Sequence, residues 1–438
     1  MPLSAAEVDP RSGYCAATRT FHSIRPPLPL PPADLPLSFP AFMFSLLPAA
    51  LPSRPALVDA ATGEAVPFPA FLSRVRALAA ALRARLGVSR GDVAFVLAPP
   101  GVHVPVLYYA LMAVGAVVSP ANPALTAGEI SGLIALSGPS VAFAVKATAG
   151  KLPPDLNTVL LDSARFLSFF HEARDEDGAA AGTDVVTHQS DPAAILYSSG
   201  TTGRAKAVVL THRNLMASDA TRAAATAEGY GLTETTSGFC RAVGEAESAQ
   251  IGSVGRLSWG AQAKIVHPET GVALPPGVPG ELWVRGPFVM KGYAGDEDST
   301  SKIMDSEGWL RTGDLCYIDK YGIVFVVDRL KELIKYKGYQ VPPAELESLL
   351  QTHPDIDEAA VVSYPDDQAG ELPVAFIVSS SGSILHEAQI KEFVAKRVVH
   401  YKQIHHIFFV NSIPKNAAGK ILRKDLAKLT LQHIQSKL

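Results

Sequence analysis

Residues 197–206 read YSSGTTGRAK, and this stretch decides how the rest of the chain is interpreted. An apolar segment (193–197) leads into a loop of glycines and hydroxyl-bearing residues, and a second apolar segment (207–210) follows Lys206 directly. Glycines let backbone N–H groups approach an anion, hydroxyls add donors, and a lysine supplies positive charge for phosphate. The pattern predicts a strand–loop–strand unit that binds phosphate, and a polar hairpin loop without a ligand is the alternative.

This loop differs from the phosphate loop of kinases and GTPases. In a Walker A loop a glycine precedes the lysine and a helix follows it. Here Ala205 precedes Lys206, and residues 207–210 predict a strand. The kinase and GTPase classes are therefore excluded by the predicted topology of the loop.

The composition is that of a globular chain without excess positive charge. The chain has 438 residues, of which 47% are hydrophobic and 18% charged, and its net charge is −3. The length favours about three domain-sized units, and the charge balance argues against a nucleic-acid partner. Cys15, Cys240 and Cys316 lie far apart, which predicts isolated thiols. The most apolar stretch (106–118) is too short for a membrane span, so none is expected.

The first half of the chain alternates between helical and strand-like patterns. Helices are predicted at 68–86, at 102–114 and after the capping box at 126–129. Strands are predicted at 92–97, 116–119, 141–145 and 159–161. This alternation predicts an α/β fold with a wound, mostly parallel sheet.

The second half has a different texture. Short strands punctuated by Gly and Pro are predicted at 263–267, 281–285, 309–314 and 323–328, which indicates a β-rich subdomain. Beyond it, strands are predicted at 359–363, 374–378 and 407–410, and helices from 342–343 and at 390–399. We therefore expect a Pro-rich lead-in (1–40), a large N-terminal domain (41–328) and a small α+β C-terminal domain (329–438).

Four further motifs follow the loop at 197–206. They read GYGLTE at 229–234, TGD at 312–314, DRLKELIKYKGYQ at 328–340 and GK at 419–420. In this order the five motifs resemble those of the adenylate-forming acyl-CoA synthetases, and their wording is most similar to plant 4-coumarate–CoA ligase and its ligase-like relatives. The resemblance runs from about Phe39 to Leu429. It implies an acid–thiol ligase that uses ATP, Mg²⁺ and coenzyme A and passes through an acyl-adenylate.

The resemblance also implies roles for residues of the large domain. It assigns the ATP phosphates to Ser198, Ser199, Gly200, Thr201, Thr202 and Lys206. It assigns Mg²⁺ to Glu234, a hard oxygen ligand for a hard cation. It places the adenylate against Glu228, Gly229, Tyr230 and Thr233, with the ribose hydroxyls at Asp314 and Arg329. Taken alone, the TGD and DR motifs would be read as a turn and a solvated ion pair.

In the small domain the resemblance implies a catalytic set, a hinge and a coenzyme A contact. Lys420, Lys335 and Gln340 are the expected catalytic residues, and all three contact the nucleotide. Lys331 is the expected hinge and also lies at the nucleotide, while Lys337 and Gly338 are expected to contact coenzyme A. Without the other motifs, these residues would be interpreted as a solvated lysine loop and a charged surface hairpin.

Two departures from the family pattern stand out. Ala205-Lys206-Ala207 replaces the usual Pro-Lys-Gly, which alters loop stiffness but keeps the lysine. More seriously, helix-like residues 211–227 run directly into the motif at 229–234. Relatives place a long segment there, with a His-containing motif, most of the acyl pocket and an Arg that meets coenzyme A. We therefore expect an N-terminal domain truncated in its middle, from an exon-skipped isoform or an incomplete gene model, with lost sheet neighbours and exposed strand edges.

Three functions compete on this reasoning. The first is a carboxylate–CoA ligase for a cinnamic, fatty or oxylipin-type acid, and the second is a catalytically impaired, internally deleted form of such a ligase. A luciferase-like oxygenase is a distant third. The chain ends in Ser436-Lys437-Leu438, which is typical of a peroxisomal address and predicts import through the peroxisomal receptor.

Overall fold

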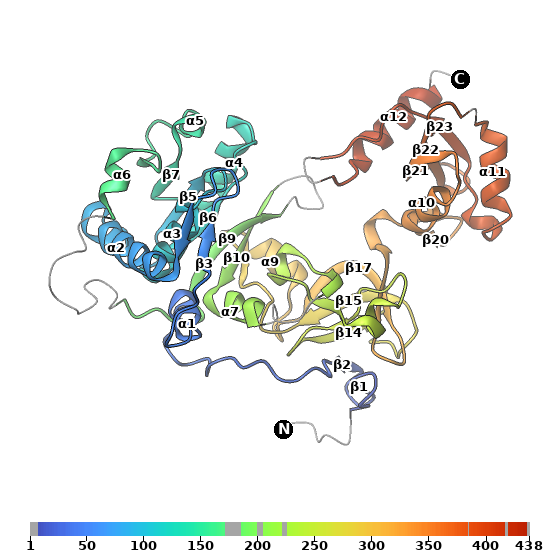
Figure 1. Cartoon of the computed structure of the whole chain (residues 1–438). Helices are drawn as coiled ribbons and strands as arrows, with labels where there is room; N and C mark the ends of the chain where they lie inside the picture. Colours follow the sequence, from blue (N-terminus) through green and yellow to red (C-terminus); the bar gives the residue numbers. More distant parts are fainter. Residues whose placement is uncertain are drawn as a thin grey trace.

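The computed structural model describes residues 8–170, 185–198, 205–220, 226–383, 385–416 and 419–435, with the backbone alone described at 226–228 and 431–435. Figure 1 shows three groups of elements: a helix-covered sheet, a second sheet below and beside it, and a smaller unit set apart at the C-terminal end. The fold is mixed α/β, as predicted.

The first group is built on a seven-stranded sheet. Its strands, in spatial order, are β16 (Gly292–Tyr293), β10 (Lys206–Thr211), β9 (Pro192–Ser198), β6 (Val117–Pro120), β5 (Val93–Leu97), β7 (Val141–Ala144) and β8 (Thr158–Leu160). The strands from β9 to β8 pair in parallel, whereas β9, β10 and β16 pair antiparallel. The predicted wound, mostly parallel sheet is confirmed, and so is the strand–loop–strand unit around Lys206.

Helices cover both faces of this sheet. α2 (Phe68–Leu86) and α3 (His103–Ala113) pack on one face with α1 (Phe39–Ser45) beside them, and α4 (Ala127–Ser137) packs on the other. α2 has the predicted bounds and ends at Gly87 with φ +68°, a left-handed cap that glycine adopts without strain. The capping box at Thr126 is present. The short elements β3 (Pro55–Val58), β4 (Ala65–Pro67), α5 (Lys146–Ala149) and α6 (Ala164–Ser168) lie around them.

The second group is a six-stranded antiparallel sheet. It runs β1 (Tyr14–Cys15), β2 (Thr20–His22), β14 (Gln262–Val266), β15 (Gly280–Arg285), β17 (Leu310–Ile318) and β18 (Val324–Arg329). The predicted β-rich subdomain is confirmed. Its first two strands come from the expected lead-in, and Cys15 and Phe21 are fully buried in its core. Part of the lead-in is therefore core structure, because its strand pairing with β14 joins residues far apart in sequence.

A small sheet lies where the shortened middle meets the next motif. It contains β11 (Thr226–Tyr230), β12 (Cys240–Val243) and β13 (Arg256–Leu257), with α8 (Glu245–Ser248) beside it. The predicted helix at 211–227 is wrong at its end: α7 is described over His212–Ala220, residues 221–225 lie outside the described residues, and β11 starts at Thr226. Pairing with β12 overrides local helix propensity there. Among the described residues, β11 is an end strand of this sheet and pairs with β12 alone.

The small unit has its own sheet and core. After η3 (Leu330–Glu332) come β19 (Ile334–Tyr336), β20 (Tyr339–Val341), α10 (Pro343–Gln351), β21 (Ile356–Asp366), β22 (Gly370–Ser379), α11 (Glu387–Ala395), β23 (His406–Phe409) and α12 (Arg423–Gln435). The predicted α+β tail is confirmed. α11 begins and ends earlier than the predicted 390–399, and α12 was not predicted.

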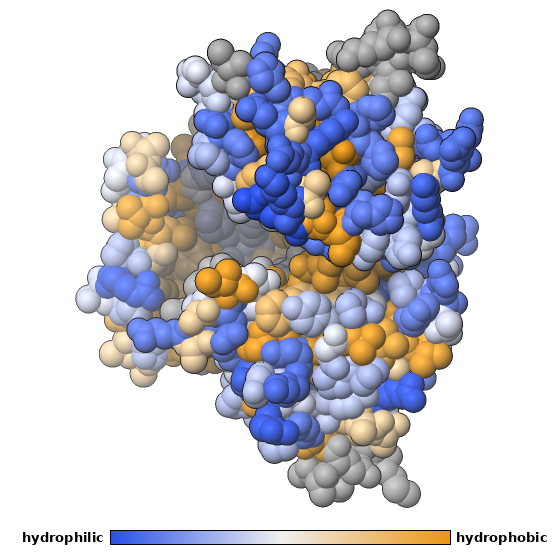
Figure 2. Space-filling view, turned by 90° about the vertical axis from the view of Figure 1, so that its right-hand side faces the viewer, coloured by the Kyte–Doolittle hydropathy of each residue, from blue (hydrophilic) through white to orange (hydrophobic). Residues whose placement is uncertain are grey.

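The surface of the joined units is mixed. In Figure 2 apolar side chains gather along the seam where the small unit stands over the six-stranded sheet, between otherwise polar surfaces. No helix in the described part of the chain is long and apolar enough to cross a membrane. Cys15, Cys240 and Cys316 are buried free thiols, as predicted.

Candidate active site

A polar cavity of about 310 Å³ lies where the first two groups meet the small unit. Every one of the five sequence motifs contributes at least one residue to its lining. The lining consists of Ser198, Lys206, Gly231, Leu232, Thr233, Glu234, Tyr293, Ile303, Leu310, Arg311, Thr312, Arg329 and Lys420. The motifs therefore converge on one cavity although the middle of the chain is shortened.

Three residues that line the cavity, Lys206, Tyr293 and Glu234, are in contact with one another. We call these three residues the floor of the cavity. The Lys206 ammonium lies 4.3 Å from the centre of the Tyr293 ring, within cation–π distance. The Tyr293 hydroxyl donates a hydrogen bond of 2.9 Å to Glu234 Oε1. Burial and the neighbouring Glu234 charge raise the pKa of Tyr293, so it stays a neutral donor. Tyr293 thus fixes both charged groups, one through its ring and the other through its hydroxyl.

The strand–loop unit brings donors to the same floor. Ser198, at the end of β9, lines the cavity, and among the described residues its buried Oγ has no hydrogen-bond partner. An orphaned hydroxyl beside an ammonium fits a phosphate oxygen. Thr233 lines the cavity beside Glu234. The predicted phosphate residues Ser199, Gly200, Thr201 and Thr202 lie outside the described residues.

The turn after β11 comes close to the neighbouring backbone. Gly231 lines the cavity, and a Cβ at this position would overlap the Ser237 carbonyl oxygen, so the approach requires glycine. Gly229 and Tyr230 do not line this cavity; they border an open depression next to it, together with Arg241. The side chain of Glu228 lies outside the described residues.

Asp314 is placed behind the cavity wall instead of in its lining. It is 2% exposed, accepts a hydrogen bond of 2.5 Å from the Tyr230 hydroxyl, and pairs through Oδ1 with Arg329 Nε at 3.1 Å. Burial raises the pKa of Asp314, and the Tyr230 hydrogen bond and the Arg329 and Lys420 charges oppose that rise. Since Arg329 lines the cavity, the expected pair of ribose residues is together, with Arg329 facing the space and Asp314 supporting it.

A tight loop of the small unit presents Lys420 to the cavity. The Lys420 N–H donates to Asn416 Oδ1 and its carbonyl accepts from the Asn416 N–H, both at 2.9 Å. Lys415 and Ile421 form a β-bridge, and Gly419 has φ +78°. These bonds close a hairpin that carries Lys420 at its base and sets its backbone direction.

The other expected residues of the small unit lie elsewhere. Lys335 and Gln340 face each other across the β19–β20 hairpin, are exposed, and do not line the cavity. Lys337 and Gly338 form the turn of that hairpin, with φ +47° and +82°. Lys331, in η3, is exposed; partial desolvation of its ammonium lowers its pKa, and the charges of Arg329 and Lys420 act in the same direction. Of the predicted catalytic set, the structure thus brings only Lys420 to the cavity.

Several cavity residues were not predicted. Tyr293 follows Gly292 on β16, opposite Val208 on β10, a pairing that no local pattern reveals. Arg311 immediately precedes the TGD motif and was overlooked although it is adjacent to a named residue. A basic residue beside a nucleotide motif is the signal that could have pointed to Arg311.

The described part of the chain contains no cluster of three or more His, Cys, Asp or Glu side chains that could hold a metal. Glu234 therefore stands as a single carboxylate. Such an arrangement fits Mg²⁺, which usually binds one or two carboxylates and takes further oxygens from substrate phosphates and water.

Comparison with known proteins identifies the family of the chain. The AMP-binding enzyme family matches residues 48–226 and 220–294, and the AMP-binding enzyme C-terminal domain matches residues 345–420. The first match is split, and its two parts meet at residues 220–226. This is the place where the sequence predicted a missing segment.

Curated relatives match nearly the whole chain. The rice protein 4-coumarate–CoA ligase-like 6 (Oryza sativa subsp. japonica) is 42% identical over 548 positions, covering 95% of this chain and 92% of the relative. The Arabidopsis thaliana protein 4-coumarate–CoA ligase-like 9 is 40% identical, covering 98% of both chains. Peroxisomal OPC-8:0-CoA ligase 1 of Arabidopsis thaliana is 36% identical, covering 97% and 98%. Since this chain has 438 residues, at least 110 of the 548 positions in the rice alignment have no residue here.

Solved structures agree on the fold. ATP-bound MatB from Rhodopseudomonas palustris superposes with a TM-score of 0.78 at 24% identity, covering 90% of this chain and 98% of the other. From the two domain matches and these relatives we conclude that the chain belongs to the AMP-binding enzymes and, within them, to the acid–thiol ligases named 4-coumarate–CoA ligase-like.

Proposed function

We propose that the chain binds Mg·ATP in the polar cavity and activates a carboxylic acid there for transfer to coenzyme A. In the first step a carboxylate oxygen attacks the α-phosphorus, and the bond to pyrophosphate breaks. In the second, the coenzyme A thiolate attacks the acyl carbon and AMP leaves. The observation that carries this proposal is the convergence of five motifs on one cavity.

The floor residues have the chemistry to hold triphosphate and metal. Lys206 and Ser198 would bind phosphate oxygens, joined by Thr233 and by the loop of Ser199, Gly200, Thr201 and Thr202. Glu234 would hold Mg²⁺, with its carboxylate oriented by Tyr293. The metal would neutralise charge on the phosphates and so ease attack by a carboxylate, which is itself an anion.

The walls would position the nucleoside and the reacting atoms. Arg329, supported by Asp314, would meet the ribose, and Tyr230 with Gly229 and Glu228 would flank the adenylate. Lys420 would lie at the α-phosphate, where negative charge increases during attack. A cation fixed there in advance stabilises the transition state more than the ground state.

The second step would use the other hairpin of the small unit. Lys337 and Gly338, at the turn between β19 and β20, are the proposed coenzyme A contacts, and Lys335 and Gln340 the proposed adenylate contacts. All four lie outside the cavity in the present arrangement. The unit would therefore turn about Lys331, since hinges lie in a few residues at the ends of elements.

The acid is proposed to be of cinnamic, fatty or oxylipin type, in keeping with the names of the relatives. A peroxisomal destination remains a prediction, for which one relative named as peroxisomal gives support. Its proposed signal, Ser436-Lys437-Leu438, lies outside the described residues. A fluorescent protein ending in this tripeptide should enter peroxisomes, and the same fusion ending in Ser-Lys-Glu should stay outside.

Carboxylate-dependent ATP–pyrophosphate exchange tests the first step. A panel of cinnamic, medium- and long-chain fatty, and cyclopentanone-type acids should include at least one that drives exchange. Lys206→Ala should abolish it, while Lys264→Ala, a lysine that packs on Trp309, serves as a matched control. Absence of exchange across the panel, with folded protein, would refute the first step.

The missing positions favour a second candidate, a ligase form impaired by its deletion. This candidate rests on the split family match, whose two parts meet at residues 220–226, and on the alignment positions of the relatives that have no residue here. It predicts a broad, non-cooperative melt that Mg·ATP does not shift. A sharp melt that rises with Mg·ATP would contradict it, because a ligand that binds only the native state raises stability.

A further inference from the structure

The small unit is joined to the large one by a short piece of chain. β18 ends at Arg329, η3 spans Leu330–Glu332, and β19 starts at Ile334. The two sides have separate cores. Some contact across this link must therefore set where the Lys420 loop lies relative to the cavity.

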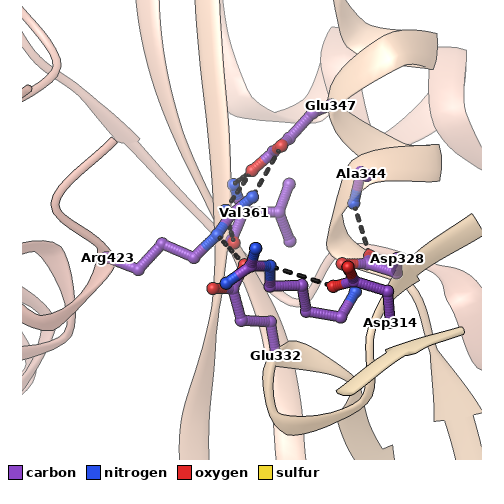
Figure 3. A network of polar contacts seen from close by, with 8 residues as sticks. Asp314, Asp328, Glu332, Ala344, Glu347, Val361 and Arg423 are labelled. Carbon is purple, nitrogen blue, oxygen red and sulfur yellow. Dashed lines mark hydrogen bonds and ion pairs between the residues drawn. The ribbon is translucent and has the colours of Figure 1, made fainter. Parts of the chain in front are cut away.

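Asp328 makes such a contact. It lies on β18, is 7% exposed, and accepts a hydrogen bond of 2.9 Å through Oδ2 from the Ala344 N–H, on the far side of the link. Its Oδ1 accepts from the Arg329 N–H at 2.7 Å. Figure 3 shows Asp328 below the start of α10, with a dashed line to Ala344.

The start of α10 needs an outside acceptor. Pro342 and Pro343 carry no N–H, so Ala344 provides the first free donor of the helix, and no side chain of the preceding residue caps it. A carboxylate at a helix N-terminus also interacts favourably with the helix dipole. Asp328 therefore acts as a cap supplied from the large unit.

A second set of contacts continues from α10 to the Lys420 loop. Glu347, one turn along α10, binds both terminal nitrogens of Arg423, and the Nη2–Oε2 distance is 3.0 Å. Arg423 also donates to the Val361 carbonyl at 2.8 Å and to Glu332 at 2.9 Å. Figure 3 shows these partners converging on Arg423 from separate elements. Since Arg423 lies three residues after Lys420, a fixed α10 fixes the base of the Lys420 loop.

We propose that Asp328 is a positioning residue: by capping α10 across the link, it holds the small unit in the orientation that places Lys420 in the cavity. This inference rests on the proposed function for the role of Lys420. It goes beyond it by naming the contact that selects the orientation used in the first step.

Charged groups around Asp328 agree with this role. Burial raises its pKa, an effect opposed by the Ala344 and Arg329 N–H groups and by Arg423. Glu332 is the one neighbouring carboxylate that acts in the same direction as burial. The acceptor that the helix start requires is the Oδ2 atom of Asp328.

Amine labelling separates positioning from simple stabilisation. Brief acetylation followed by mass spectrometry measures how far Lys206 and Lys420 are each modified, with and without Mg·ATP. In the wild type, nucleotide should protect both. In Asp328→Ala, Lys206 should stay protected while protection of Lys420 falls about fivefold, the shift expected from loss of one helix cap. In Asp328→Asn, which keeps an acceptor oxygen, protection of Lys420 should lie between that of the wild type and that of Asp328→Ala.

Asp319→Ala is the matched control. Asp319 accepts two backbone hydrogen bonds in the turn between β17 and β18, from Tyr321 at 2.8 Å and Ile323 at 2.9 Å, but does not cross the link. It should leave protection of both lysines unchanged. If Asp328→Ala leaves Lys420 as protected as in the wild type, or exposes both lysines equally, the inference is wrong.

Trypsin cleavage after Lys331 gives a readout that needs no nucleotide. Loss of the cap should raise this cleavage about fivefold in Asp328→Ala and not in Asp319→Ala. If Mg·ATP protects neither lysine in the wild type, the proposed function fails and the cleavage rates still decide the inference. Equal cleavage in the wild type and in Asp328→Ala would overturn it.

Discussion

Two hairpins of the small unit carry lysines that the sequence marks as functional, and they lie in different places. The hairpin at 415–421 brings Lys420 into the polar cavity, whereas the β19–β20 hairpin holds Lys335 and Lys337 outside it. Under the proposed function, both half-reactions use the cavity floor that contains Lys206 and Glu234. On the same proposal, this arrangement of the two hairpins would serve the first half-reaction, and the small unit would turn for the second.

Of the changes that separate the two hairpins, the one with the largest expected effect is at Lys420. Lys420→Ala should slow acyl-adenylate formation by about 100- to 1000-fold, the usual loss when one fixed group that stabilises transition-state charge is removed. Thioester formation from supplied acyl-adenylate should change little. Measuring the two half-reactions separately tests this split. Lys415→Ala, in the same hairpin but paired with Glu358 at the surface, is the control and should affect neither.

Lys337→Ala should give the reverse pattern with a smaller effect. Loss of one charge-assisted contact to a coenzyme A phosphate should raise the KM for coenzyme A about tenfold. ATP–pyrophosphate exchange should remain at the wild-type rate. If exchange falls and the KM for coenzyme A stays constant, the two hairpins do not divide the half-reactions in this way.

Tyr293→Phe should affect the common floor moderately. The variant keeps the ring beside Lys206 and removes the hydroxyl that binds Glu234. We expect the Mg²⁺ concentration needed for half-maximal exchange to rise about fivefold, in line with loss of one hydrogen bond to a charged group. Tyr317→Phe, on the six-stranded sheet, provides the control. A fall in rate with unchanged Mg²⁺ dependence would argue against a positioning role for the hydroxyl.

The smallest effect concerns the pH dependence set by Asp314. Because burial raises its pKa in the folded chain, protonation and loss of the Arg329 ion pair should begin at a higher pH than the usual aspartate pKa of 3.8. Nucleotide affinity should then weaken as the pH falls towards that raised pKa. Stability has the opposite sign: the folded state binds the proton more tightly, so the contribution of this group is present below 3.8 and is lost as pH rises through the raised pKa.

Titration of affinity and of melting temperature between pH 4 and 7, in the wild type and in Asp314→Asn, checks both slopes. The variant cannot ionise at this position and should show a flatter response in each measurement. Parallel slopes in the wild type and the variant would contradict the assignment to Asp314.

Local pattern predicted those elements whose burial is periodic. α2 has the predicted bounds because its apolar residues repeat with the helical period and Gly87 ends it. The strand–loop–strand unit around Lys206 was equally clear. The end of the helix predicted at 211–227 was not, because pairing of Tyr230 with Cys240 determines where β11 lies.

The sequence motifs predicted which residues contribute to the candidate site, but they did not predict the contacts that those residues make. Lys206, Glu234, Arg329 and Lys420 meet as expected, whereas Tyr293 joins them through a strand pairing across more than eighty residues. Asp328 caps α10 by accepting from the N–H of Ala344, sixteen positions later and on the other side of the link. Such contacts depend on tertiary placement, and no spacing in the sequence carries that information.

The most direct test of the central claim is calorimetric titration of Mg·ATP into the folded 438-residue chain, paired with the Lys206→Ala and Glu234→Gln variants. Saturable binding at one site in the wild type, weakened at least about tenfold in each variant, is the predicted result. A cooperatively folded chain that takes up no nucleotide, or binds it equally well without Lys206 and Glu234, would contradict the account.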